Sequence, residues 1–126
     1  MKLRIKGNTL RIRVSRSELA KLLGGERVED AIQFTSAPES RLTYSLQAAP
    51  QSKAIAIEWK PQWVTVSISK ERMNKWALES EVGIYEAIHL GPAGALAVTI
   101  EKDFACLDGS DEENADSFDN PRAACS

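Results

Sequence analysis

Hydrophobic and polar residues alternate at the start of the chain in a way that predicts a β-hairpin. Leu3 and Ile5 alternate with basic residues, and the same alternation returns over 10–14 after the pair Gly7-Asn8. If Gly7-Asn8 is a two-residue turn, Ile5 lies opposite Leu10 and Leu3 opposite Ile12. The hydrophobic side chains then share one face of the hairpin.

A short helix and a second pair of strands are predicted next. Ser15 and Glu18 have the spacing of a capping box at a helix start, and Gly24-Gly25 ends the helical pattern. Hydrophobic alternation then indicates strands near 28–34 and 42–46, with a turn at 37–40 between them. The first half of the chain is therefore predicted to be a ββαββ unit.

The second half repeats this pattern. Ser15 and Ser69 both precede a helical stretch, so the halves are offset by 54 residues, although near 86–88 an offset of 56 aligns better. The loop before the last strand is then about two residues shorter than its counterpart. The pattern predicts pseudo-repeats over 1–50 and 55–104. Two unrelated units with this order of elements would also align, so duplication is a hypothesis.

We expect an α+β fold with about eight short, mainly antiparallel strands and two short helices. The strands would form a closed barrel or two packed sheets. Phe34, Trp59 and Trp76 are interpreted as core residues. Pro61 has a fixed negative φ, which excludes a primed hairpin turn and favours a type I turn over 60–63.

Composition is typical of one globular domain. The chain has 126 residues, of which 43% are hydrophobic and 27% charged. We expect a single domain over 1–107 and an acidic C-terminal tail over 108–126. Since there is no apolar run of about 20 residues and no signal-peptide pattern, we expect a cytoplasmic protein without a membrane partner. Cys106 and Cys125 are then expected to be reduced.

The net charge of −2 is unevenly distributed. Beyond Ala105 the chain has one base, Arg122, and six acids, whereas the preceding part has an excess of bases. The six acids are Asp108, Asp111, Glu112, Glu113, Asp116 and Asp119. The tail and the body should therefore attract each other.

The predicted hairpin gathers basic side chains on one face. These candidate anion-binding residues are Lys2, Arg4, Lys6, Arg11 and Arg13. The predicted pairing places Arg4 opposite Arg11 and Lys2 opposite Arg13, and directly opposed like charges destabilise a hairpin. Three kinds of compensation are open: water and counterions, an external anion held by the guanidinium groups, or the protein's own acidic tail.

The leading hypothesis is a non-enzymatic binding or interaction domain with this basic face as an anion site and no cofactor. A small polyanion such as a nucleotide or polyphosphate fits the area. Nucleic acid is disfavoured, because the pI is about 5.5 and no aromatic residue lies among the arginines. Two further functions stay open: a phosphohydrolase using Glu58, Glu86 and Glu101, and a structural homodimer formed through exposed edge strands.

Metal and nucleophile candidates form no diagnostic motif. Asp103, Cys106 and His89 are of the residue types that bind zinc, but their spacing matches no regular site. His89 precedes Leu90 and Gly91-Pro92 and is interpreted as a surface residue at the end of a strand. The sequence also contains no nucleophile elbow and no phosphate-binding glycine loop.

Two family resemblances bear on these expectations. A duplicated barrel with basic residues is similar to the CYTH, or triphosphate tunnel, enzymes, but at their metal-binding acid-x-acid-x-Lys strand this chain has Lys2-Leu3-Arg4-Ile5-Lys6. That resemblance implies polyanion binding without metal-assisted hydrolysis. The opening segment 2–11, the segment 101–107 and Asp119-Asn120-Pro121 resemble a group of small uncharacterised bacterial proteins. This second resemblance implies a single stand-alone domain and no particular chemistry.

Overall fold

The computed structural model describes residues 1–78 and 81–103. Within them the chain forms eight strands, two α-helices and one short 3-10 helix. The elements are β1 (Lys2–Lys6), β2 (Thr9–Val14), α1 (Arg16–Leu23), β3 (Val28–Gln33), β4 (Arg41–Ala49), β5 (Ile55–Lys60), β6 (Trp63–Ser69), α2 (Lys70–Leu78), β7 (Gly83–His89), η1 (Gly91–Ala93) and β8 (Ala95–Lys102). The predicted α+β class and the repeated ββαββ order are confirmed.

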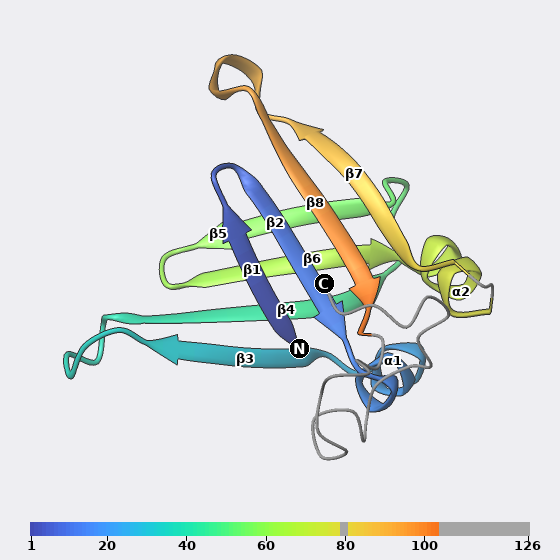
Figure 1. The fold of residues 1–126 in the computed structure, drawn as a ribbon, viewed down its shortest axis with the longest axis horizontal. Coiled ribbons are helices and arrows are strands. Elements are labelled where there is room, and N and C mark those ends of the chain that lie inside the picture. The colour runs from blue at the N-terminus through green and yellow to red at the C-terminus, as the bar shows by residue number, and fades with distance from the viewer. Residues whose placement is uncertain (79–80, 104–126) are drawn as a thin grey trace, which may run out of the picture. The chain divides into compact units, whose positions relative to one another are not determined.

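Each sheet combines one hairpin from each half of the chain. The first sheet has the order β1-β2-β8-β7 and the second the order β3-β4-β6-β5 (Figure 1). The four hairpins are antiparallel, whereas the central pairs β2–β8 and β4–β6 are parallel. The described strands thus form two mixed sheets and not a closed antiparallel barrel. Of the two alternatives expected from the sequence, a closed barrel or two sheets, the second is confirmed.

The chain divides into two compact units, each with one sheet. Of the described residues, 1–19 and 81–103 form the unit of the first sheet, and 20–78 form the unit of the second. The expectation of a single domain over 1–107 stays a prediction. The expected acidic tail over 108–126 lies outside the described residues.

The strand registers repeat between the two sheets. In the second sheet Thr43 pairs with Trp63, and in the first sheet Ala97 pairs with Thr9, so each position of one pair lies 54 residues from its counterpart in the other. The hairpin β3–β4 pairs Val28 with Leu46, whereas β7–β8 pairs residues 84 and 100, at offsets of 56 and 54. The loop between β7 and β8 is therefore two residues shorter than its counterpart, as the sequence predicts.

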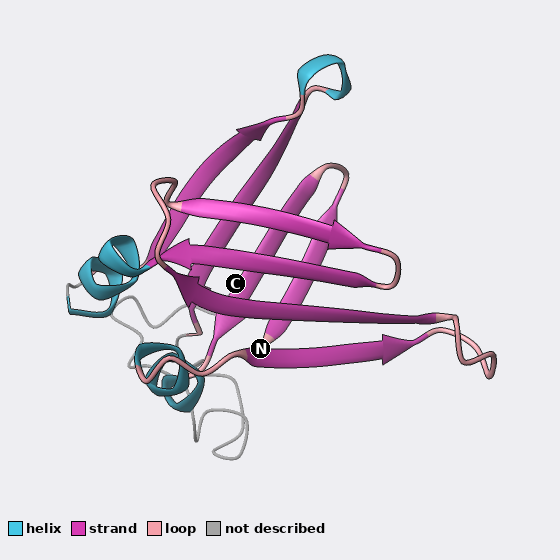
Figure 2. Cartoon of the chain, turned by 180° about the vertical axis from the view of Figure 1, so that it is seen from behind, coloured by secondary structure: helices cyan, strands magenta, loops and turns pink. Residues whose placement is uncertain are grey.

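Each sheet has an apolar face and a polar face, because side chains alternate along a strand. The apolar residues Ile12 and Ile100 of the first sheet are buried, as are Leu46 and Ile68 of the second. The strands of the second sheet lie side by side in Figure 2, seen from behind. Its polar face includes the buried side chain of Ser45.

Side chains and glycines define the helix ends as the sequence predicts. The Ser15 amide donates to Glu18 Oε1 at 2.9 Å, and the Glu18 amide donates to Ser15 Oγ at 3.3 Å, which completes the capping box before α1. After α1, Gly25 has φ +84° and its amide donates to the Leu22 carbonyl. Before α2, Ser69 Oγ accepts from the Arg72 amide at 3.1 Å.

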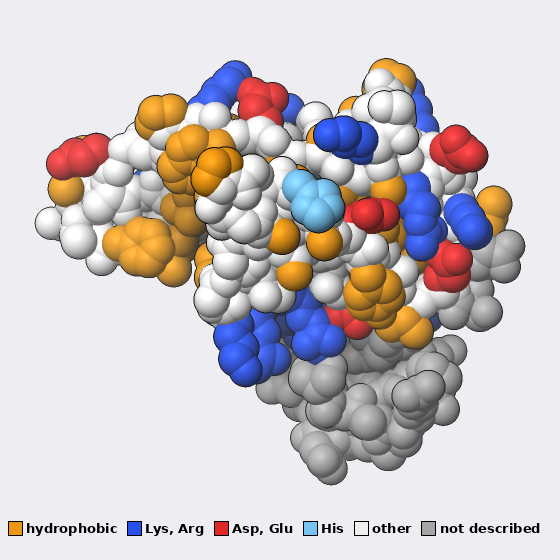
Figure 3. All heavy atoms as spheres, turned by 90° about the horizontal axis from the view of Figure 1, so that it is seen from above, with side chains coloured by type: hydrophobic (Ala, Val, Ile, Leu, Met, Phe, Trp, Pro, Cys, Tyr) orange, Lys and Arg blue, Asp and Glu red, His pale blue; other side chains and the backbone are white. Residues whose placement is uncertain are grey.

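Two of the three expected core aromatics are exposed. Trp76 in α2 is fully buried, but Trp59 is 67% and Phe34 65% exposed. Phe34 follows the end of β3 and Trp59 lies near the end of β5, and both strands are at the edges of the second sheet. Figure 3 shows hydrophobic side chains, in orange, on the molecular surface.

The predicted turn type at Pro61 is also wrong. Gln62 has φ +68°, and a positive φ at the third turn position belongs to a type II turn, not to type I. The proline still occupies the second turn position, where its fixed φ suits both types.

Candidate functional site

The basic residues of the first hairpin share one face, as predicted. Gly7 has φ +54° and forms a two-residue turn with Asn8, which sets the register of β1 and β2. The ladder pairs Lys2 with Arg13 and Arg4 with Arg11. Side chains of directly paired residues point to the same face of a sheet. The hairpin therefore concentrates cations on the polar face of the first sheet.

Two carboxylates at the end of the neighbouring strand β8 compensate part of this charge. Arg11 Nε donates to Glu101 Oε1, and Lys2 Nζ lies 3.0 Å from Asp103 Oδ2. The Glu101 and Asp103 side chains are largely buried. Solvent, an external anion and the acidic tail were the compensation expected from the sequence, and these two carboxylates were missed. Glu101 and Asp103 are separated by one residue, so on a strand both carboxylates point to the same face, and this spacing could have indicated them.

Glycine at position 83 makes room for the Glu101 side chain. A Cβ atom at Gly83 would lie 2.8 Å from Glu101 Cγ and 2.9 Å from the Ile100 carbonyl oxygen. It would also lie 3.1 Å from the Tyr85 hydroxyl. Distances below about 3 Å between such atoms require the neighbours to move. Gly83 thus permits Glu101 to lie between Arg11 and Tyr85.

The position of Glu101 between Arg11 and Tyr85 affects the pKa values of both neighbours. The hydrogen bond to Glu101 raises the pKa of Arg11 above its ordinary value. Partial burial raises the pKa of Tyr85, and the negative charge of Glu101 raises it further. Glu101 therefore stabilises both the charged guanidinium and the neutral phenol.

A hollow remains above the basic hairpin. It has a volume of about 310 Å³ and is lined by Lys2, Leu3, Arg4, Arg11 and Arg13. Four of the five predicted anion-binding residues therefore surround one space, and Lys6 does not line it. Within the described residues Arg4 has no ion pair and no side-chain hydrogen bond. Among the described residues, this face has five cations and two carboxylates, an excess of three positive charges.

The metal candidates are not brought together. His89 is exposed at the end of β7, as predicted, and pairs with Ala95 at the beginning of β8. Asp103 follows the other end of β8 and contacts Lys2. Cys106 and Cys125 lie outside the described residues. Among residues 1–78 and 81–103, no group of three or more possible ligands is close enough to hold a metal ion.

The acids predicted for a phosphohydrolase do not form one cluster either. Glu86 pairs with Val98 and lies on the apolar face of the first sheet, whereas Glu101 lies on its polar face. Glu58 belongs to the other unit and lies 3.1 Å from Lys60 Nζ. The described structure thus gives no shared carboxylate site of the kind that such an enzyme requires.

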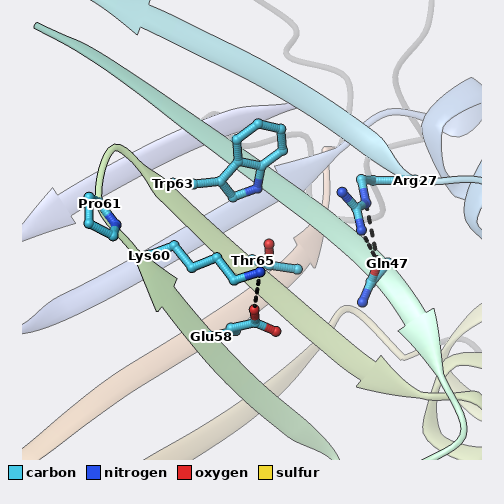
Figure 4. A pocket seen from close by; sticks show the side chains of 7 residues that line it. All are labelled: Arg27, Gln47, Glu58, Lys60, Pro61, Trp63 and Thr65. Atoms are coloured by element: carbon cyan, nitrogen blue, oxygen red, sulfur yellow. Dashed lines mark hydrogen bonds and ion pairs between the residues drawn. The ribbon is translucent and has the colours of Figure 1, made fainter. Parts of the chain in front are cut away.

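A second hollow, which sequence reasoning missed, lies on the polar face of the second sheet (Figure 4). Its volume is about 440 Å³, and it is lined by Arg27, Gln47, Glu58, Lys60, Pro61, Trp63 and Thr65. Trp63 Nε1 donates to Ser45 Oγ at 3.3 Å, and Ser45 Oγ donates to Thr65 Oγ1 at 3.1 Å. The sequence does not predict this site, because β5 and β6 lack the many basic residues that mark β1 and β2.

Comparison with known proteins gives a family and no activity. No helix of the described chain is long and apolar enough to cross a bilayer. No curated protein and no solved structure matches the chain significantly. A family described as of unknown function (DUF7009) matches residues 1–122. This match agrees with the expected resemblance to uncharacterised proteins, and the chain belongs to the DUF7009 family.

Proposed function

We propose that the protein binds a small polyanion on the basic face of the first sheet. The hollow of about 310 Å³ lined by four cationic side chains carries the proposal. Guanidinium groups present several N–H donors in a plane and hold phosphate or carboxylate oxygens in pairs. Arg4 is the principal contact, because no carboxylate pairs with it in the described chain.

The partly neutralised cations have a supporting role. Glu101 holds the Arg11 side chain, and Asp103 contacts Lys2, so these two side chains are oriented before a ligand arrives. A ligand then loses less free energy in ordering the site. The remaining excess of positive charge attracts an anion and makes its binding sensitive to salt.

The test is a calorimetric titration of the full-length chain with inorganic triphosphate at low and moderate salt. We expect saturable binding that weakens as salt rises. Arg4→Gln should lower the affinity about tenfold, since a hydrogen bond to a charged group contributes about 1.5 kcal/mol. Arg41→Gln is the matched control, because Arg41 is an exposed arginine of the second sheet. Absence of binding at low salt, or equal affinity of the two variants, would contradict the proposal.

The acidic tail is the alternative occupant of this face. Replacing its six carboxylates by amides in the full-length chain removes the charge without shortening the protein. If the tail competes for the basic face, this variant binds triphosphate more tightly than the natural sequence. Unchanged affinity would exclude the tail as a competitor. Magnesium-dependent release of phosphate during the titration would instead favour a phosphohydrolase.

A further inference from the structure

We propose that the hollow on the second sheet is a separate binding site for a planar heterocycle that carries a phosphate group, such as a nucleoside monophosphate. All seven lining residues belong to residues 20–80, so the site is complete within one unit. Its volume of about 440 Å³ lies in the range of small-ligand pockets, about 300–1,000 Å³. This site goes beyond the polyanion binding proposed for the first sheet.

Trp63 provides the surface for the heterocycle. Its indole N–H is held by Ser45 Oγ, and Ser45 is itself 2% exposed and bonded to Thr65. The ring is therefore fixed by a buried hydroxyl pair, and its polar atom already has a partner. What such a ring offers a ligand is its aromatic surface, on which any nucleobase can stack.

Arg27 provides the contact for the phosphate. Its Nε and Nη2 atoms donate to Gln47 Oε1 at 3.2 and 3.0 Å, and Gln47 Nε2 donates to Ser67 Oγ at 3.1 Å. The guanidinium is oriented by these bonds and retains further N–H groups, since arginine has five donors. Figure 4 shows Trp63 and Arg27 at separate places around the hollow, so one ligand can contact the indole ring with its base and the guanidinium with its phosphate.

Lys60 and Glu58 form the third side of the hollow (Figure 4). Both side chains are mostly exposed, and an exposed ion pair contributes little to stability, so a ligand can rearrange it. Arg27 and Lys60 outnumber the one carboxylate, which favours an anionic ligand over a neutral sugar. Glu58 can accept hydrogen bonds from ribose hydroxyls or an exocyclic amine.

The first sheet does not offer the same chemistry. The residue 54 positions before Trp63 is Thr9, and Arg4 corresponds in the same way to Glu58. The aromatic ring and the carboxylate of these two positions are therefore not repeated at the equivalent positions of the first sheet. The two hollows are expected to bind different ligands.

The experiment follows the three indole N–H resonances of the full-length chain by nitrogen-edited NMR during titration with AMP, adenosine and ribose 5-phosphate. We expect AMP to shift the Trp63 resonance saturably, with adenosine and ribose 5-phosphate each at least tenfold weaker. Trp63→Leu and Arg27→Gln should each weaken AMP binding about tenfold or more, measured by calorimetry. The matched controls Trp59→Leu and Arg41→Gln should leave it unchanged.

Several results would overturn this site. They are the absence of a saturable Trp63 shift up to millimolar AMP, an equal affinity for adenosine, and an equal loss of binding in Trp59→Leu. Retention of the Trp59 and Trp76 resonances shows that the Trp63→Leu chain is folded. Arg4→Gln separates this site from the one on the first sheet, because it should leave the AMP-induced shift of Trp63 unchanged.

Discussion

The polar faces of the two sheets have the same backbone pairing and different chemistry. Arg11 of the first sheet corresponds to Thr65 of the second at the repeated register, and Glu101 corresponds to Gln47. In the first sheet Glu101 accepts from Arg11 of β2, whereas in the second Gln47 accepts from Arg27, which precedes β3. An acceptor thus lies at the same position of both sheets, but its cation comes from β2 in the first sheet and from the segment before β3 in the second.

The difference extends to the residue beside the acceptor. At the offset of 56 residues that relates β3 to β7, Arg27 corresponds to Gly83. Glu101 occupies the space above Gly83, whereas the Arg27 side chain fills the equivalent space beside Gln47. Cation, acceptor and neighbouring residue therefore differ together between the two sheets, because each limits the space and charge available to the others.

The largest expected effect comes from filling the space above residue 83. Gly83→Val should destabilise the protein by about 3 kcal/mol, because the new side chain meets Glu101 and the Ile100 carbonyl. Arg27→Val at the equivalent position should cost less than about 1 kcal/mol, because its side chain is exposed. Urea denaturation of both variants measures the difference. Similar losses would show that the two positions are not differently packed.

The next effect tests the pairing of Glu101. Glu101→Gln introduces the residue type of the second sheet and should cost about 2 kcal/mol, because Arg11 loses its carboxylate. Adding Arg11→Thr, again as in the second sheet, should restore part of the loss. Urea denaturation of the single and double variants gives the coupling free energy. Strictly additive losses would refute the view that Glu101 and Arg11 are energetically coupled.

A smaller effect distinguishes the two helix starts. Burial alone would raise the pKa of Glu18, but hydrogen bonds from the Met1 ammonium group and Ser15 lower it below its ordinary value. A lowered carboxyl pKa stabilises the fold above the ordinary pKa of glutamate, and this stability is lost as pH falls through the lowered value. Glu18→Gln should cost about 1 kcal/mol near neutral pH and nothing in acid.

Thermal melts across acidic pH measure this difference between Glu18→Gln and the natural chain. The control is Glu71→Gln, which removes an acidic residue from the first turn of α2. That helix has Arg72, not a glutamate, where α1 has Glu18, so its start has no reciprocal carboxylate bond. An equal pH dependence in both variants would count against a specific role for Glu18.

The smallest effect is a change in the titration of Tyr85. Its pKa is raised by partial burial and by Glu101, so Glu101→Gln should shift the pKa downward while burial keeps it above the ordinary value. Since a raised tyrosine pKa stabilises the fold below the ordinary value, that stability is lost as pH rises through the folded-state pKa. Ultraviolet absorbance against pH measures the shift, with Tyr44 as the internal reference. A shift of both tyrosines would indicate a general rearrangement.

Local chemistry explains what the sequence predicts correctly. The register of the first hairpin follows from the alternation and from Gly7, and the capping box follows from the spacing of Ser15 and Glu18. The shorter second loop follows from the change of offset between the halves. In each case the interacting residues are close together in the sequence, so the residue pattern is sufficient to predict which of them pair.

The pairing of strands that are far apart in the sequence could not be predicted from the sequence. Nothing local indicates that β2 pairs in parallel with β8, so the neutralisation of Arg11 by Glu101 was not predicted. Hydrophobicity alone also could not show that Trp59 lies near the end of an edge strand. The candidate residues were identified, but their partners depended on which strands lie side by side.

Because each sheet contains one hairpin from each half of the chain, neither half alone can complete a sheet. A polypeptide of residues 1–50 would contain β2 and β4, each with one hydrogen-bonding edge that β8 and β6 occupy in the whole chain. Two copies of such a half could complete both sheets by swapping hairpins. The protein is therefore organised as a tethered dimer of its halves, and fragments separated between residues 50 and 55 should reassociate when mixed.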